Sequence, residues 1–414
     1  MKRYGNLWHR LVSWENLLLA ARKARRGKRD RAAIQRFEFD LEGNLLTLQR
    51  ELMGGYYRPG EFTTHWITRP KPRLISAAPY RDRVVHHALM NVLEPILERH
   101  FHPHSYACRA CKGTHAAADR LQKLLGGRRH FMQFDVRKYF PSIDHAILKG
   151  LFRRLVKDGR ALALMDLIVD GSNDQEGVAE YFAGDDLFAP HRRRRGLPIG
   201  NLTSQWFANW YLNGLDHHVT SRLGIGAYVR YCDDFVLLHD DRQALRDAAA
   251  SVREYLAGLR LRLHEGRCQA HPSRRGLAFV GYRVWATHRL VRKSNVREFR
   301  RRVRRMGRAY AAGLLDWNDI KPRLASWIGH ARQADSERLL WRLCREWTFA
   351  RDGAVDVPCS ARRQLEQQSC QLPFCQPQQE HARQPEQQHR VSCCRALSTG
   401  ALPSRPESRR LRAA

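Results

Sequence analysis

The chain lacks a long apolar run, and its first ten residues are polar and basic, so the sequence predicts neither a membrane span nor a signal peptide. Ten cysteines are present, but they form no regular framework, and five of them lie after residue 358. A secreted protein held together by disulfides is therefore not indicated. We expect a cytoplasmic protein with reduced thiols.

Acidic residues are also scarce. The 414 residues include 73 Lys and Arg but only 41 Asp and Glu, which gives a formal net charge of +32. This excess indicates a polyanionic partner, and nucleic acid is the first candidate because phosphate neutralisation dominates such binding. An anionic membrane surface is the alternative, and the missing apolar run counts against it. The length and a hydrophobic share of 43% allow two or three domains with a sizeable core.

Apolar residues recur at helical spacing in several segments, while Gly and Pro cluster between residues 54 and 80, where we expect short strands and turns. Helices are predicted for residues 1–50, 82–101, 201–215 and from 295 onward. Asn295 and Glu298 resemble a capping box, which predicts that the last helical segment begins there.

Three aspartates lie where strands are predicted to end. In the strand expected at residues 131–136, apolar residues alternate so that Asp135 points away from the apolar face. Asp233 and Asp234 occupy the tip of a hairpin expected at residues 228–238. Nucleotidyl transfer uses two divalent ions about 3.5–4 Å apart, and Mg²⁺ prefers carboxylate oxygens. The sequence therefore predicts a Mg²⁺ site where these three carboxylates converge.

Five segments match, in the correct order, the motifs of one enzyme family. They are Arg73–Val85, Phe134–Phe140, Tyr231–Asp234, Phe279–Tyr282 and Ser326–His330. Phe134–Phe140 resembles the first catalytic motif of reverse transcriptases, and Tyr231–Asp234 resembles their Tyr-x-Asp-Asp box. The others are similar to the fingers motif of the bacterial members, the primer-grip turn and a thumb signature. The resemblance covers about residues 55–350 and implies an RNA-directed DNA polymerase.

The resemblance also implies roles for single residues. Asp135 and Asp233 would be the principal metal ligands, and Asp234 would complete the carboxylate cluster. Arg73, together with Lys71, would hold the incoming triphosphate, because a guanidinium binds phosphate oxygens bidentately. The alternative for Arg73 is an ordinary surface charge.

Further positions follow from the same resemblance. Phe140 occupies the steric-gate position, where its ring would exclude a ribose 2′-hydroxyl; the alternative is an ordinary core phenylalanine. Gly200 would allow the backbone to approach the nascent base pair closely. Phe279, Gly281 and Tyr282 would form the primer grip.

The segment Leu197–Gln205 departs from most reverse transcriptases, which have Gln at the position of Ile199 and a Ser-Pro pair after Gly200. This variant resembles the enzymes of diversity-generating retroelements, which copy a template repeat with errors at adenines. An apolar Ile199 cannot make the amide hydrogen bond that Gln makes near the nucleotide, which implies looser control of the base pair. A simple packing substitution is the alternative reading.

A second departure concerns the general acid for pyrophosphate, often a Lys just before the primer grip. Arg267 stands in that place, but a guanidinium does not readily give up a proton. Arg267 would then only stabilise charge, or His264 would donate the proton. The sequence leaves these two alternatives open.

The implied fold class is α+β: a right-hand polymerase with an antiparallel palm sheet backed by helices. We expect a basic helical extension, fingers and palm, a helical thumb and a disordered low-complexity tail, at residues 1–54, 55–289, 290–351 and 352–414. The implied cofactor is Mg²⁺. The implied partners are an RNA template, a DNA (cDNA) primer strand, dNTPs and a small basic helical accessory oligomer, with no membrane.

Three alternatives to a retroelement enzyme remain. Two are a retron-like and a group II intron-like reverse transcriptase, and Ile199 and Gln205 argue against both. The third is a non-catalytic RNA-binding protein with a decayed polymerase core. The intact Asp135, Asp233 and Asp234 speak against that third alternative.

The C-terminal tail has an unusual composition. Glu366–Gln368 recurs as Glu386–Gln388 within a stretch rich in Gln. Glu and Gln codons end in AA or AG, and Gln, His and Pro codons begin with C, so each Glu-Gln, Gln-Gln, Gln-Pro or Gln-His step read one base later encodes Asn or Ser. We therefore expect the DNA that encodes residues 361–394 to overlap the template repeat, read in another frame. The alternative is an ordinary disordered segment of low complexity.

Overall fold

The computed structural model describes residues 3–68, 72–173, 180–264, 266, 268–347 and 349. Within these residues, no helix combines the length and the apolar character needed to cross a membrane. Contacts divide the chain into two compact units. The main unit runs to Arg297 and also contains Ile328–Glu337, and the second unit contains Glu298–Trp327 and resumes at Arg338. The tail considered above lies outside the described residues.

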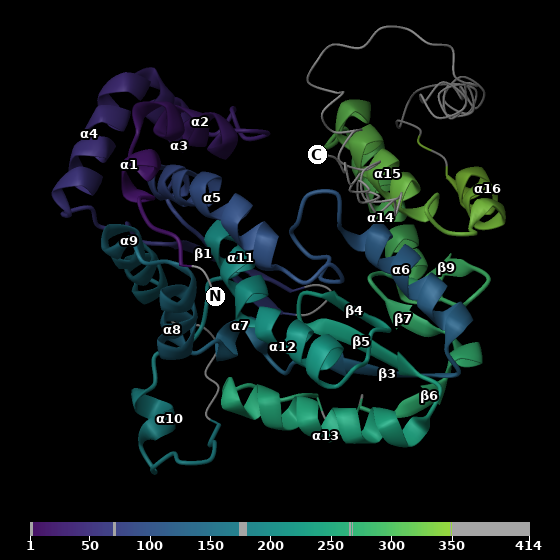
Figure 1. Ribbon diagram of the computed structural model, residues 1–414. Coiled ribbons are helices and arrows are strands. Elements are labelled where there is room, and N and C mark those ends of the chain that lie inside the picture. The colour runs from purple at the N-terminus through teal and green to yellow at the C-terminus, as the bar shows by residue number, and fades with distance from the viewer. Residues whose placement is uncertain are drawn as a thin grey trace, which may run out of the picture. The chain divides into compact units, whose positions relative to one another are not determined.

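The described chain is a mixture of helices and antiparallel strands, which confirms the predicted α+β class (Figure 1). The helices of the main unit are α1 Trp8–Leu11, α2 Trp14–Ala24, α3 Ala32–Phe39, α4 Leu41–Gly54, α5 Tyr80–His100, α6 Thr114–Gly127, α7 Tyr139–Ser142, α8 His145–Leu155, α9 Gly159–Asp170, α10 Ala189–Arg192, α11 Leu202–Tyr211, α12 Asn213–His217, η1 (a π-helix) His218–Arg222, α13 Arg242–Gly258 and η3 (a 3₁₀ turn) Ser273–Arg275. The strands are β1 Thr63–Ile67, β2 Arg73–Ala77, β3 His130–Asp135, β4 Tyr228–Tyr231, β5 Asp234–His239, β6 Ala270–Pro272, β7 Leu277–Phe279, β8 Tyr282–Val284 and β9 Arg289–Val291.

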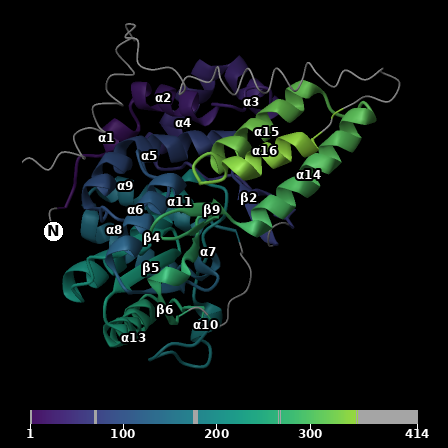
Figure 2. The same cartoon turned by 90° about the vertical axis from the view of Figure 1, so that its right-hand side faces the viewer.

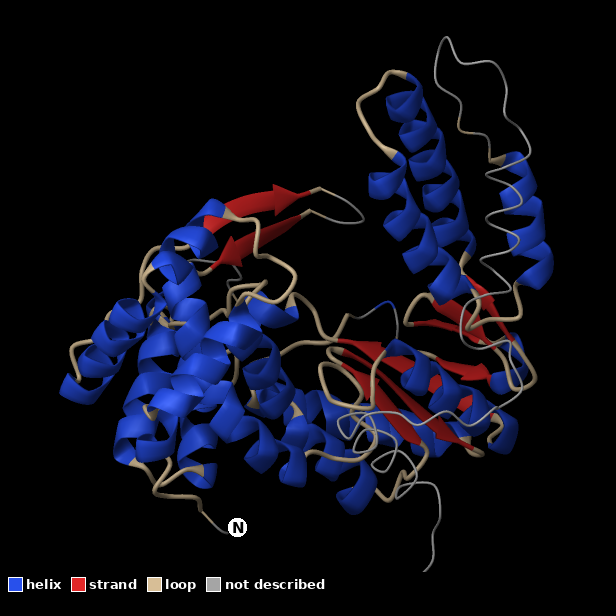
Figure 3. Ribbon diagram, turned by 90° about the horizontal axis from the view of Figure 1, so that it is seen from above, coloured by secondary structure: helices blue, strands red, loops and turns tan. Residues whose placement is uncertain are grey.

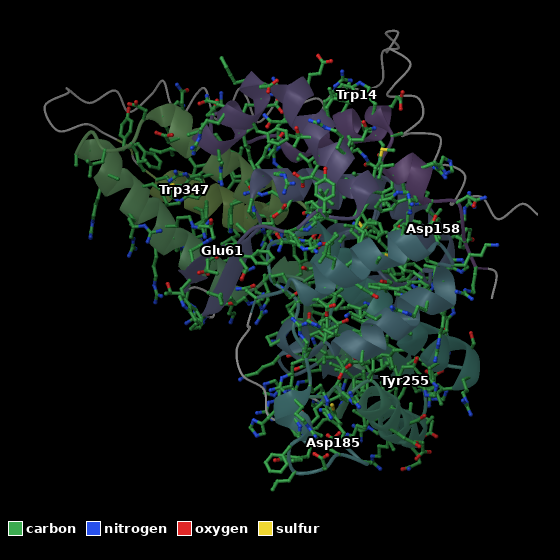
Figure 4. The ribbon with its side chains drawn as sticks, turned by 90° about the vertical axis from the view of Figure 1, so that its left-hand side faces the viewer. Trp14, Glu61, Asp158, Asp185, Tyr255 and Trp347 are labelled. Carbon is green, nitrogen blue, oxygen red and sulfur yellow. The ribbon has the colours of Figure 1, made fainter. Side chains whose placement is uncertain are left out.

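Helices α1, α2 and α3 pack on the long helix α5, and α4 packs on α2 and α3, because their apolar residues repeat at helical spacing and enter one continuous core. Side-chain caps fix where the helices begin. Ser13 accepts from the backbone N–H of Asn16 at the start of α2. Asp158, labelled in Figure 4, caps α9 at Ala161 N–H and also accepts from the backbone N–H groups of Leu7 and Trp8 at 2.7 and 2.9 Å. One carboxylate thus joins the N-terminal segment to α9.

The central sheet has four antiparallel strands in the order β4-β5-β3-β6. Period-two alternation puts large apolar residues on one face, which belongs to the same apolar cluster as Leu245, Val252 and Leu256 of α13. Helix α13 contacts β3, β5 and β6 and covers that face (Figure 1). The opposite face also carries buried apolar residues, Phe131, Val236 and Leu238, and at its end it carries the polar side chains of Gln133, Asp135 and Asp234.

Two smaller sheets complete the main unit. Strands β1 and β2 form a separate antiparallel hairpin, and β7, β8 and β9 form a three-stranded meander (Figure 3). The hairpin confirms the strands expected between residues 54 and 80, and the helix expected at 82–101 is α5.

Three helices follow the meander: α14 Lys293–Ala311, α15 Trp317–Ala331 and α16 Glu337–Glu346 (Figure 2). The second unit is built from most of them, and its core includes Phe299, whose ring stacks on Trp327 with centroids 3.9 Å apart. The predicted cap at Asn295 is wrong. Helix α14 begins two residues earlier, and the Asn295 amide instead donates to the carbonyl of Gly281 at 3.3 Å. This tertiary hydrogen bond outweighs the local capping preference.

Candidate active site

Strands β3 and β5 bring two of the predicted aspartates side by side. Their register pairs Asp135 with Asp234 and Phe134 with Phe235. Phe134 and Phe235 are fully buried and stack with centroids 4.9 Å apart, on the face that shares an apolar cluster with α13. Residues paired directly across a sheet share a face and alternate along the strand. The Asp135 and Asp234 side chains therefore lie together on the face opposite the phenylalanines.

The turn between β4 and β5 carries Asp233. Its preceding residue, Cys232, has φ of +57°, a left-handed conformation that costs a non-glycine residue about 1–2 kcal/mol. The carbonyl of Asp233 accepts from the backbone N–H of Val136 at 3.2 Å. This bond ties the turn to the end of β3, immediately beside Asp135.

The electrostatics of the turn also connect these residues. Burial raises the pKa of the Asp233 carboxyl, the neighbouring Asp135 charge raises this pKa further, and Arg73 opposes both effects. Two carboxylates that repel each other are a poor arrangement for the protein alone. They become favourable when a cation binds between them.

Asp234 has a different environment from Asp233. Its Oδ1 accepts from Gln133 Nε2 at 2.9 Å, and the same amide donates to the carbonyl of Ala278 at 3.2 Å. Gln133 lies on the carboxylate face because it is two residues before Asp135. The alternation expected for residues 131–136 places Gln133 on this face, but its partners come from β5 and β7 and cannot be predicted from the local sequence.

A divalent metal fits this site if the protein supplies only part of its coordination shell and substrate and water supply the rest. Among the described residues, no group of three or more His, Cys, Asp or Glu side chains is arranged to enclose a metal. Mg²⁺ is commonly held by one or two carboxylates together with waters and substrate phosphates. Two carboxylates from adjacent chain segments match that pattern.

The hairpin β1–β2 presents Arg73, the first residue of β2, which pairs with Ile67. Lys71 lies outside the described residues. The segment around Ile199 runs beside β2: Ser76 N–H donates to the Ile199 carbonyl at 2.9 Å, and Ala78 N–H donates to Asn201 Oδ1 at 3.2 Å. The nucleotide-binding candidates of the hairpin and of this turn thus belong to one hydrogen-bonded assembly.

Gly200 sits at the closest approach of these two segments. Its φ is +120°, and a Cβ atom there would lie 3.1 Å from Ile75 Cγ2 and 3.4 Å from the Ser76 carbonyl oxygen. A glycine is required both by conformation and by space.

Phe140 lies on the short helix α7, which follows Asp135 directly. Its carbonyl accepts from Leu197 N–H at 2.9 Å, and its ring is partly buried against the core, edge-on to Tyr139. The segment carrying Ile199 and the segment carrying Phe140 are therefore also joined. The ring is neither fully buried nor fully exposed.

The predicted primer grip is the β7–β8 turn. Phe279 pairs with Tyr282, and Val280 and Gly281 between them have φ of +41° and +93°. The Tyr282 hydroxyl bonds to His330, with 2.8 Å to Nδ1 and 2.9 Å to the carbonyl oxygen, and the two rings stack with centroids 4.4 Å apart. The last residue of the predicted thumb signature thus packs on the primer-grip turn.

Of the two candidates for the general acid, Arg267 lies outside the described residues. His264 is exposed, and its backbone N–H donates to the carbonyl of Asp135 at 2.8 Å. The backbone of His264 therefore lies beside the end of β3 that carries Asp135.

Comparison with known proteins concerns the same part of the chain. The family model for reverse transcriptase (RNA-dependent DNA polymerase) matches residues 67–284, which include both strand ends, the turn and the Ile199 segment. Protein YkfC of Escherichia coli K12 is 26% identical over 291 residues, which is 60% of this chain and 71% of YkfC.

Two other relatives are intron proteins. The group II intron-encoded protein LtrA of Lactococcus lactis subsp. cremoris is 26% identical over 181 residues, which cover 43% of this chain and 28% of LtrA. The mitochondrial nuclear intron maturase 1 of Arabidopsis thaliana is 24% identical over 172 residues, which cover 36% of this chain and 24% of the maturase. The chain spans less than a third of these two relatives. Since the family model covers more than half of the 414 residues, the chain belongs to the reverse transcriptase family, the RNA-dependent DNA polymerases.

Proposed function

We propose that this reverse transcriptase makes error-prone cDNA from a template-repeat RNA, as the enzyme of a diversity-generating retroelement. The observation that carries the proposal is Ile199 in the sequence Leu197–Gln205. Leu197 and Pro198 are buried, whereas Ile199 is partly exposed and Gly200 is exposed. A partly exposed Ile199 supports contact with a nucleotide over the alternative of a core packing substitution.

The proposal assigns the chemistry to Asp135 and Asp233 as ligands of Mg²⁺, with Asp234 completing the cluster. Bound Mg²⁺ supplies a Lewis acid that activates the primer 3′-hydroxyl and neutralises the leaving pyrophosphate. The charge of Asp135 acts on Asp233, whose backbone bonds to Val136 beside Asp135, and Gln133 fixes the orientation of Asp234. Arg73, with Lys71, receives the triphosphate.

The remaining groups position the two strands. Phe140 excludes a 2′-hydroxyl, Gly200 admits the nascent base pair, and the turn at Phe279, Gly281 and Tyr282 holds the primer end. In this scheme residues 55–289 are fingers and palm, residues 290–351 are the thumb, and residues 1–54 and 352–414 are the extension and the tail. Six arginines along α14 are exposed and could neutralise the phosphates of a nucleic-acid backbone. They are Arg297, Arg301, Arg302, Arg304, Arg305 and Arg308. A small basic helical accessory oligomer is part of the proposal as a further partner.

The test is the substitution Ile199→Gln. Restoring an amide beside the nucleotide should lower misincorporation opposite template adenine on a defined RNA, while total cDNA synthesis is preserved. Ile199→Val is the matched control, because it keeps the apolar character and should keep the errors. Equal adenine error frequencies for Ile199→Gln and wild type, with normal synthesis, would remove the support for an error-prone retroelement enzyme.

The tail supplies an independent test. With permissible codons, Glu386–Cys394 read one base later gives Asn-Asn-Asn-Ile-Gly-Phe-Arg-Val, similar to the Asn-rich variable ends of C-type-lectin-fold proteins. An Asn codon AAC has adenines at both positions that decide the amino acid, so it suits mutagenesis at adenines. The coding DNA decides: stops in the shifted frame, or no nearby near-copy differing at adenines, would contradict this part of the proposal.

A group II intron-type enzyme is the second candidate, because LtrA is among the relatives. The error assay separates the two. Low error frequencies that do not depend on the template base would favour the intron-type enzyme.

A further inference from the structure

Arg230 is the largest fully buried side chain of the described residues. It lies in β4, two residues before Cys232. Its Nε and Nη2 donate to Oδ1 and Oδ2 of Asp216 at 2.6 Å each, and Asp216 is fully buried too. The Tyr228 hydroxyl also donates to Asp216 Oδ1, at 2.6 Å. The result is a bidentate ion pair inside the core.

The other donors of the guanidinium are also used. Nη1 donates to the Cys232 carbonyl at 2.9 Å and to Asn209 Oδ1 at 3.2 Å, and Nη2 donates to the Asn209 carbonyl at 3.4 Å. All five N–H groups of Arg230 therefore have an acceptor. Four of these acceptors, on Asp216 and Asn209, fix the guanidinium plane, and the fifth, the Cys232 carbonyl, belongs to the turn that carries Asp233.

The backbone of Arg230 is held as firmly as its side chain. Its N–H donates to the His104 carbonyl, and its carbonyl accepts from Tyr106 N–H, both at 2.9 Å. Arg230 cannot shift along β4 without breaking these bonds. The guanidinium that bonds to the Cys232 carbonyl is therefore fixed in place and cannot move with that carbonyl.

Stability alone is a weak reason for such a pair. Moving two charges out of water is so costly that replacing a buried ion pair by apolar residues of similar size is often neutral or stabilising. The turn offers another reason. The left-handed conformation of Cys232 is strained, and a hydrogen bond from a charged donor is stronger than one between neutral groups. The bond from Arg230 to the Cys232 carbonyl therefore offsets the strain immediately before Asp233.

We propose that Arg230 is a positioning residue of the polymerase: its guanidinium, oriented by Asp216, holds the strained Cys232 carbonyl and so keeps Asp233 beside Asp135. The inference rests on the proposed metal-binding role of Asp233. Arg230 touches neither metal nor substrate in this account and acts only through the turn.

The test uses a triple variant, Arg230→Met with Asp216→Leu and Tyr228→Phe, which removes every polar atom of the ion pair together. Its melting temperature should stay close to that of wild type, because losing the bonds to Cys232 and Asn209 is offset by the desolvation cost that the two buried charges no longer incur. Its Mn²⁺ affinity, measured by electron paramagnetic resonance without substrate, and its kcat should both fall about 10–100-fold, as for other residues that orient metal ligands. The KM for primer–template should change less than twofold.

Two single variants make the test independent of the fate of the triple variant. Arg230→Lys keeps a charge opposite Asp216 but loses the fork that reaches Cys232, and it should lose Mn²⁺ affinity. Tyr228→Phe is the matched control: it removes one hydrogen bond from Asp216 and none from Cys232, so it should bind Mn²⁺ normally.

Wild-type Mn²⁺ affinity in folded Arg230→Lys, or losses that only follow the folded fraction measured by circular dichroism, would overturn the inference. Asp233→Asn distinguishes this failure from a failure of the site itself. If Asp233→Asn is inactive while the Arg230 variants bind metal normally, only the positioning role is wrong. If Asp233→Asn keeps primer extension, the assigned site is wrong.

Discussion

Replacing Gly200 by alanine should separate the β1–β2 hairpin from the Ile199 segment. A Cβ at φ of +120° costs about 1–3 kcal/mol in backbone strain. Crowding against Ile75 Cγ2 at 3.1 Å adds about 1–3 kcal/mol if nothing moves. The two hydrogen bonds that join the segments, at Ser76 N–H and Ala78 N–H, together contribute only about 2 kcal/mol. Local separation is therefore the cheaper response.

Hydrogen exchange measures this directly. The amides of Ser76 and Ala78 should lose up to about 30-fold protection, the equivalent of about 2 kcal/mol. Since β2 carries Arg73, KM for dNTP should rise about tenfold, while the melting temperature falls only modestly. Gly224→Ala is the control: φ there is +69°, but a Cβ would meet no atom within 4 Å. It should cost stability and leave both the amides and KM unchanged. Wild-type protection at Ser76 in folded Gly200→Ala would refute the reasoning.

Two further predictions concern the carboxylate face and the sugar gate. Because burial and Asp135 raise the pKa of Asp233, the stability that this group contributes is complete below its unfolded pKa and is lost as pH rises through its folded pKa. Asp233→Asn should abolish Mg²⁺-dependent extension, because it removes a proposed metal ligand. In EDTA the same substitution should raise the melting temperature, and by more at pH 7 than at pH 4. A gain in melting temperature that shrinks as the pH rises would contradict the environment assigned to Asp233. Phe140→Ala should admit ribonucleotides, and unchanged rNTP/dNTP selectivity would mean that Phe140 is not the gate.

The sequence predicted strands β3, β4 and β5 well because their signals are local. Alternation in residues 131–136 identified the face of Asp135, and the register of β3 with β5 confirms that this face also carries Asp234. The hairpin at residues 228–238 was equally readable, since two β-rich runs flank a short turn. In both segments the residues that decide the structure lie within a few positions of one another.

Predictions from local patterns were insufficient where distant segments supply the partner. Asn295 has the composition of a helix cap, yet its amide bonds to Gly281, fourteen residues earlier, and the helix starts at Lys293. Gln133 could be placed on a face but not paired, because its acceptors come from two other strands. An arginine between apolar residues of β4 is a warning of a buried charge, but only the topology identifies Asp216 as its partner.

The same long-range bonds bear on the role that we propose for position 199 in base-pair control. The Ile199 carbonyl accepts from β2, which begins with Arg73, and two residues before Ile199 the Leu197 N–H bonds to Phe140. Backbone hydrogen bonds therefore link the segments whose residues are proposed to hold the triphosphate, exclude the 2′-hydroxyl and face the base pair. These bonds do not depend on which side chains the residues carry. A change from an amide to an apolar side chain at position 199 leaves those backbone bonds intact. Under the proposed function it would alter fidelity without removing polymerase activity, and this combination is what the proposed diversifying enzyme requires.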